Sequence, residues 1–130
     1  MSYLDTSVAL AHLLAEDRRP PAEIWTEDLV ASRLLEYELW VRLNGRDLAR
    51  SHGDLARLLL ARIAFVELHA SVLSRALQPF PLPVRTLDAL HLATAAFLRE
   101  RGHELHLASY DARMRQAAEA MGIPPISMPV

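Results

Sequence analysis

The sequence contains neither cysteine nor lysine, and it has only four glycines in 130 residues. Without cysteine there is no disulfide framework, no thiolate metal site and no cysteine nucleophile. Without lysine there is no P-loop lysine, no Schiff-base chemistry and no lysine-dependent phosphoaspartate site. The four glycines form neither a GxGxxG dinucleotide loop nor a GxSxG hydrolase elbow. These absences exclude the enzyme classes that depend on those groups.

Long apolar runs and an excess of positive charge are also missing. Fourteen arginines stand against sixteen acidic residues, so the net charge is −2 and any nucleic-acid binding must be local. Asp5 and His12 interrupt the apolar N-terminal stretch, which is therefore not a signal peptide. No segment reaches the roughly 18 apolar residues of a membrane helix. We expect a cytoplasmic protein without a membrane partner, folded as one domain over residues 1–130.

Apolar periodicity and turn residues predict an alternation of short strands and helices. The predicted strands are 2–4, 29–31, 65–68, 105–109 and 125–127, the last of them short. The predicted helices are 7–16, one that begins at Pro21, one from Ser32 to Gly45, 54–64, 69–77, 86–101 and 111–121. This order predicts an α/β fold, with a parallel sheet of four to five short strands between two layers of helices.

In such a sheet a ligand site lies at the carboxyl ends of the strands. Asp5 follows the first strand and Asp111 follows the fourth, while Asp88 lies in the first turn of the helix before that strand. Glu38 lies inside the helix after the second strand. These four acids are the candidate site residues.

Each aspartate also has a purely structural explanation. Asp5 and Asp111 are in positions to cap helices, and Asp88 is favoured by the dipole at the start of its helix. Glu38 is different, because its helical neighbours include leucines and an unpaired acid there is costly to bury. It needs a cation, either Arg42 or a metal ion. Glu36 lies about 200° around the helix and is expected to be an ordinary solvated acid.

Four carboxylates at one edge of a sheet would repel one another, and a bound divalent cation would reverse that effect. Carboxylate ligands suit hard ions such as Mg²⁺ or Mn²⁺. The chemistry that uses such a site is phosphodiester hydrolysis, in which the metal orients the phosphate and activates a water molecule.

Four segments carry a family resemblance over essentially the whole chain: MSYLDTSV, SRLLEYELWVRL, VRTLDALHLATA and ASYDARMRQAA. In order and spacing they resemble the PIN domain, and in particular the VapC toxins of bacterial VapBC toxin–antitoxin pairs. The third segment, around Asp88, is the most specific. The resemblance implies a PIN-like three-layer α/β/α sandwich.

Carried over by residue, the resemblance implies that the catalytic and metal-binding quartet is Asp5, Glu38, Asp88 and Asp111. Glu38 is chosen over Glu36 because it lies six residues after Ser32 and four before Arg42. The supporting polar positions are Thr6, Ser7 and Ser109. Two residues, Arg42 and Arg85, are candidates for RNA or phosphate contact, with charge balance against the acids as the equal alternative. His91 is interpreted as a packed helix histidine.

The resemblance further implies an endoribonuclease dependent on Mg²⁺ or Mn²⁺ that cuts structured RNA such as tRNA or rRNA and inhibits translation. It implies a cognate VapB-like antitoxin and a homodimer. Two alternatives remain at this point. One is a PIN scaffold that binds RNA or protein without cutting. The other is a phosphatase-like enzyme with an acidic pocket, which the absence of lysine disfavours.

Overall fold

The computed structural model describes residues 1–16 and 18–128. The elements follow the order β1 (Ser2–Leu4), α1 (Thr6–Leu13), the 3-10 helix η1 (Ala22–Thr26), β2 (Leu29–Ser32), α2 (Leu34–Gly45), α3 (Ala49–Leu60), β3 (Ile63–Val66), α4 (Ala70–Ala76), α5 (Thr86–Glu100), β4 (His106–Ala108) and α6 (Ala112–Ala120). None of the helices in this part of the chain is long and apolar enough to span a membrane.

The four strands form one parallel sheet in the order β3-β2-β1-β4. The predicted α/β class and parallel sheet are therefore confirmed. The expected fifth strand at 125–127 is reduced to a single bridge between Leu107 and Pro125. Pro124 and Pro125 have no N–H group to donate, so the bridge consists of the Leu107 amide donating to the carbonyl of Pro124 and the Ile126 amide donating to the carbonyl of Leu107.

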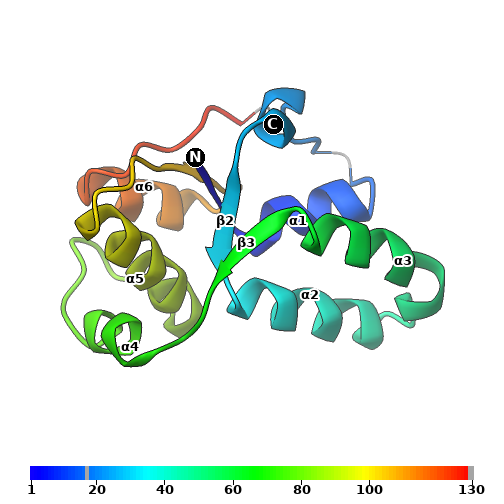
Figure 1. Ribbon diagram of the computed structural model, residues 1–130, viewed down its shortest axis with the longest axis horizontal. Coiled ribbons are helices and arrows are strands. Elements are labelled where there is room, and N and C mark those ends of the chain that lie inside the picture. Colours follow the sequence, from blue (N-terminus) through cyan, green and yellow to red (C-terminus); the bar gives the residue numbers. More distant parts are fainter. Residues whose placement is uncertain (17, 129–130) are drawn as a thin grey trace.

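Alternate residues of the strands face opposite helical layers, as the period-two geometry of a strand requires. Leu4 and Ala31 pack with α1, α2 and α3, whereas Tyr3 and Val30 pack with α5 and α6. Figure 1 shows the same division, with α1–α3 on one side of the sheet and α4–α6 on the other. The molecule is thus a three-layer α/β/α sandwich whose short strands are covered on both faces.

Several predicted boundaries are wrong by a few residues. The helix expected over 54–64 is α3, which begins at Ala49 and ends at Leu60, and β3 accordingly starts at Ile63 rather than Phe65. The helix expected from Pro21 is only a 3-10 helix, and α1 ends at Leu13. Apolar residues continue across these junctions, so periodicity alone does not mark where a helix gives way to a strand.

The predicted helix ends at Gly102 and Gly122 are confirmed. Both glycines have positive φ, 92° and 80°, a conformation that side chains disfavour. After each one, the next amide bonds back to the helix, His103 to Leu98 and Ile123 to Ala118. The turn at Gly102 leads the chain from α5 into β4, and the turn at Gly122 leads it out of α6.

Candidate active site

The four predicted acids line one cleft of about 860 Å³, at the carboxyl end of the sheet. Asp5 follows β1 directly, and its amide donates a 2.9 Å hydrogen bond to the carbonyl of Ala108 at the end of β4. Because β1 and β4 are adjacent parallel strands, this bond brings Asp5 and Asp111 to the same edge. α2 and α5 supply Glu38 and Asp88 from opposite sides of the sheet.

Asp5 precedes α1 but does not cap it. Its side chain makes no capping hydrogen bond and is only 6% exposed. The Oδ2 atom instead accepts hydrogen bonds from Ser7 Oγ (2.6 Å) and Ser109 Oγ (2.8 Å). Within the described residues, Oδ1 accepts no hydrogen bond from the protein. The structure therefore orients this carboxylate with one oxygen held and the other available.

The predicted supporting hydroxyls connect Asp5 to the loop that carries Asp111. Ser7 Oγ accepts from the amide of Tyr110 at 3.1 Å, and Ser109 Oγ accepts from the amide of Asp111 at 3.0 Å. A hydroxyl can donate and accept together, so each serine holds a carboxylate and a backbone amide at once. The two sides of the cleft are positioned by the same pair of side chains.

Asp111 does cap its helix. Its Oδ1 accepts from the amides of Arg113 (2.9 Å) and Met114 (3.2 Å) at the start of α6. Its Oδ2 lies 3.3 Å from a guanidinium nitrogen of Arg85. The structural explanation offered for Asp111 is thus confirmed, although the residue also lines the cleft.

Asp88 is the acid with the fewest compensating contacts. Its side chain is 21% exposed, and its charged partner is Arg85, whose Nε lies 3.6 Å from Oδ2. Burial raises the pKa of Asp88, and the charges of Asp111 and Asp5 raise it further, against the opposing effects of Arg85 and His91. The cleft therefore concentrates negative charge around Asp88.

Glu38 is held from two other elements. Thr6 Oγ1 donates to its Oε1 at 2.8 Å, and Nε2 of His91 lies 2.7 Å from the same oxygen. Burial raises the pKa of Glu38, but the hydrogen bond and charge of His91, the hydrogen bond of Thr6 and the charge of Arg42 outweigh it and leave the pKa lowered. The sequence argument expected Arg42 or a metal as the partner. Among the basic side chains, His91 makes the direct contact, and Arg42 acts through its charge.

Glu36, the acid rejected on the sequence, points elsewhere. It pairs with Arg33 at 3.4 Å, and Arg33 also pairs with Glu67 on the surface at 2.9 Å. None of these three residues lines the cleft. The family resemblance and the helix geometry both favoured Glu38, and of these two acids it is Glu38 that lines the cleft.

Arginines surround the acids at the cleft. Arg18, Arg42, Arg46 and Arg85 all line it. Arg85 contacts both Asp88 and Asp111, so in this structure it balances charge. Arg42 is exposed and makes no ion pair within the described residues, which leaves its guanidinium accessible from the cleft.

His91 is the functional candidate to which the sequence argument assigned only a packing role. Its burial at 1% exposed agrees with the interpretation as a packed helix histidine. That interpretation did not include its bond to Glu38. The available signal was its spacing: His91 lies one helical turn after Asp88 and thus on the same face of α5.

The chemistry of these residues fits a hard divalent cation. All four candidates are carboxylates, and the raised pKa of Asp88 marks negative charge that a cation would relieve. In the described ranges, however, no three Asp, Glu, His or Cys side chains stand close enough together to hold one ion. Arg85 lies between two of the acids, so a shared ion requires side-chain movement there.

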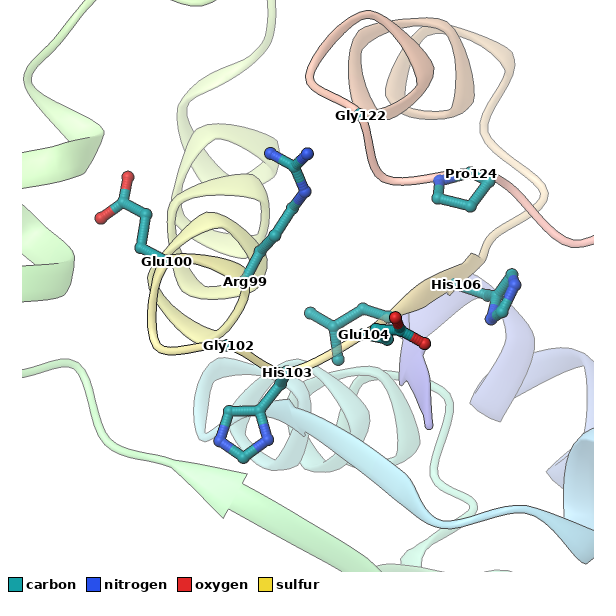
Figure 2. A pocket seen from close by; sticks show the side chains of 9 residues that line it. Arg99, Glu100, Gly102, His103, Glu104, His106, Gly122 and Pro124 are labelled. Atoms are coloured by element: carbon teal, nitrogen blue, oxygen red, sulfur yellow. The ribbon is translucent and has the colours of Figure 1, made fainter.

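A second hollow, of about 440 Å³, lies at the amino end of β4 (Figure 2). It is lined by the end of α5 and by the turn after α6. In Figure 2 the side chain of Arg99 extends toward Gly122, and a Cβ added there would lie 2.7 Å from that guanidinium. None of the predicted site residues lines this hollow. The acidic cleft is the candidate active site.

Comparison with known proteins matches residues 2–120 to the PIN domain family. The chain belongs to the PIN-domain family. Among its relatives is "Ribonuclease VapC35" of Mycobacterium tuberculosis, 32% identical over 127 residues, which are 95% of this chain and 93% of that protein. A second, "Ribonuclease VapC46" of the same species, is 40% identical over 78 residues, 59% of this chain and 58% of the relative.

A solved toxin–antitoxin complex from Klebsiella pneumoniae contains a chain with the same fold as this PIN domain. The two superpose with a TM-score of 0.65 at 20% identity, covering 87% of this chain and 88% of the other. At this identity the likeness concerns the fold. The resemblance to PIN domains and VapC toxins inferred from the sequence is confirmed by the family match and the relatives.

Proposed function

We propose that this PIN-domain protein is a metal-dependent endoribonuclease and the toxin of a toxin–antitoxin pair. The observation that carries the proposal is the convergence of Asp5, Glu38, Asp88 and Asp111 on one cleft that is also lined by four arginines. These acids come from four separate parts of the chain. Relatives over nearly the whole length bear the name ribonuclease.

Asp5, Glu38 and Asp88 are the residues that would hold Mg²⁺ or Mn²⁺, with Asp111 completing the site. When bound, the metal would orient a phosphodiester, activate water for attack and stabilise the developing negative charge. Thr6, Ser7 and Ser109 keep the carboxylates in place through their hydroxyls. Arg42 would contact backbone phosphates of the RNA, and Arg85, which pairs with Asp88 and Asp111, could do the same if those acids held a cation.

The substrate is structured RNA, with tRNA and rRNA as the first candidates, so that cutting stops translation in the cytoplasm. The partner is a VapB-like antitoxin that blocks the cleft. Exposed apolar side chains provide surface for the antitoxin and for a second copy of the chain: Leu55 and Leu58 on α3, Leu73 on α4, and Leu77 after it. Light scattering of the protein alone and with its antitoxin tests both assemblies.

Cleavage of a panel of tRNA and rRNA fragments tests the activity. We expect cutting with Mn²⁺, none with EDTA, and a fall of at least about 100-fold in Asp5→Asn. Asparagine preserves the shape and one acceptor oxygen, so Ser7 and Ser109 keep a partner. Asp54→Asn is the matched control, because Asp54 is a fully exposed acid on α3 outside the cleft.

If Asp5→Asn cuts as well as the unaltered protein, the assignment of the cleft is wrong. Mapping of new RNA 5′ ends in cells after brief induction, compared between the unaltered protein and Asp88→Asn, identifies the target. An absence of new ends with the unaltered protein contradicts the ribonuclease proposal.

A further inference from the structure

A buried chain of hydrogen bonds runs from the sheet to Glu38. The amide of Ser32 at the end of β2 donates to the hydroxyl of Tyr3 at 3.2 Å. That hydroxyl lies 3.1 Å from Nδ1 of His91, and Nε2 of His91 lies 2.7 Å from Glu38 Oε1. Tyr3 is 0% and His91 1% exposed, so neither exchanges these partners for water.

We propose that His91 is a positioning residue for Glu38, and that the Tyr3 hydroxyl holds the His91 ring in the orientation that performs this role. The inference rests on the proposed function, because it assigns His91 to the same metal-dependent site. It adds a residue that itself need not touch metal or RNA.

The donors and acceptors of this chain have only one consistent order for a neutral ring. An ionised carboxylate can only accept hydrogen bonds, so the proton of His91 faces Glu38 from Nε2. In the neutral ring Nδ1 carries a lone pair and accepts from the Tyr3 hydroxyl, and in the charged ring Nε2 still donates to Glu38. The Tyr3 oxygen in turn accepts from the Ser32 amide. In the neutral ring the hydrogen bonds therefore all run in one direction, from the Ser32 amide through Tyr3 and His91 to Glu38.

The consequence for Glu38 is a fixed orientation. Thr6 and His91 both bond to Oε1, and within the described residues Oε2 has no hydrogen-bond partner. A glutamate side chain loses substantial conformational entropy when it is held in one rotamer. In this protein that entropy cost belongs to folding, so ligand binding does not add it. The free oxygen belongs to a residue that lines the cleft. Asp5 shows the same division, with Oδ2 held and Oδ1 free.

The bond between His91 and Glu38 also joins the two helical layers. His91 lies on α5, whose buried face packs with Tyr3, whereas Glu38 lies on α2 and Thr6 on α1 across the sheet. Burying a histidine and a tyrosine hydroxyl there is costly unless both are satisfied. An apolar side chain at position 91 would suit the adjacent core, so packing alone does not require this pair of polar groups.

Two amide substitutions separate positioning from packing. In His91→Gln the side-chain nitrogen reaches about as far as Nε2 and can still donate to Glu38. In His91→Asn the amide ends near the position of Nδ1 and cannot. Both variants bury a polar amide and lose the ring, so they have similar effects on packing. Tyr3→Phe removes only the hydroxyl that faces His91.

Binding of Mn²⁺ to the metal-free protein, followed by the EPR signal of free Mn²⁺, is the first measurement. We expect a dissociation constant about 10- to 100-fold weaker for His91→Asn, in the range found for residues that orient metal ligands, and less than about threefold weaker for His91→Gln. Asp54→Asn is again the control. Equal losses in the two amide variants, or tight binding by His91→Asn, overturn the proposal.

Cleavage kinetics provide a readout that damaged folding does not move. For His91→Asn we expect the Mn²⁺ concentration for half-maximal activity to rise by the same factor, with an unchanged KM for RNA. A partly unfolded sample would lose activity at all Mn²⁺ concentrations without a shift of that midpoint. An unshifted midpoint refutes the positioning role.

The ring nitrogens of His91 can be observed without metal and without altering His91. In ¹⁵N-labelled protein we expect a proton on Nε2, both in the unaltered protein and in Tyr3→Phe, because the Glu38 carboxylate can only accept there. A ring without a proton on Nε2 in the unaltered protein refutes the assignment. If that protein takes up no Mn²⁺, the proposed function fails together with the role of His91, whereas undiminished binding by His91→Asn refutes only the latter.

Discussion

Replacing Asp88 by asparagine is expected to stabilise the metal-free protein while abolishing its activity. The Asp88 carboxylate is largely buried, and the nearby charges of Asp111 and Asp5 oppose its ionisation. Asparagine has the same shape but no charge. The variant therefore removes a charge repulsion that a bound cation would otherwise relieve.

The size of the effect follows from the exposure of the groups involved. With partial solvent screening, the release of repulsion amounts to about 0.5–1 kcal/mol. The lost contact with Arg85 offsets little, because that guanidinium is 71% exposed and 3.6 Å away. For a chain of 130 residues the net gain corresponds to a rise in Tm of about 2–4 °C.

The pH dependence fixes the sign. Because the folded state raises the pKa of Asp88, it holds the proton more tightly than the unfolded state, and ionisation destabilises the fold as pH rises through this range. Thermal unfolding in EDTA at pH 7.5 should show Asp88→Asn as the more stable protein. The difference should disappear at pH values where Asp88 is protonated in both states.

Mn²⁺ should reverse the order of stability. At 100 times its dissociation constant a ligand adds about 2.7 kcal/mol to the stability of the protein that binds it, so the unaltered protein should become the more stable of the two. Asp54→Asn, which removes one charge outside the cleft, should follow the unaltered protein in both conditions. A lower Tm for Asp88→Asn than for the unaltered protein in EDTA at pH 7.5 would refute the reasoning.

The remaining predictions concern the partners of the acids. Ser109→Ala removes a buried donor to Asp5 and an acceptor for the amide of Asp111; unfolding in urea should show a loss of about 1–3 kcal/mol, and an unchanged midpoint would contradict this role. Arg85→Ala frees two acids, so activation should need up to about fivefold less Mn²⁺; a requirement for more Mn²⁺ would show that Arg85 supports the site. The folded state lowers the pKa of Glu38, so its ionisation stabilises the fold above the ordinary glutamate pKa of about 4.3, and this contribution disappears as pH falls through the folded-state pKa. The stability difference between the unaltered protein and Glu38→Gln, measured by urea unfolding, should therefore shrink below about pH 4; a constant difference would contradict it.

The structural explanations for the aspartates show where sequence reasoning was sufficient. Asp111 caps α6 because Oδ1 of an aspartate at that position reaches two free amides of its own helix, a purely local arrangement. Asp5 is at the equivalent position before α1, yet its side chain turns to Ser7 and Ser109. Ser109 is 104 residues away in sequence, so local pattern could not reveal that choice.

The sequence by itself predicted the order of the elements and the parallel sheet, because these follow from residue spacing. The four candidate acids followed from the predicted strand ends and helix positions together with the resemblance to PIN domains. Only the tertiary structure decided which partner each acid has. Glu38 on α2 bonds to His91 on α5, a helix that packs on the opposite face of the sheet. Hydrogen-bond partners at the carboxyl edge of the sheet depend on how the layers pack, and packing between distant segments leaves no periodic trace in the sequence.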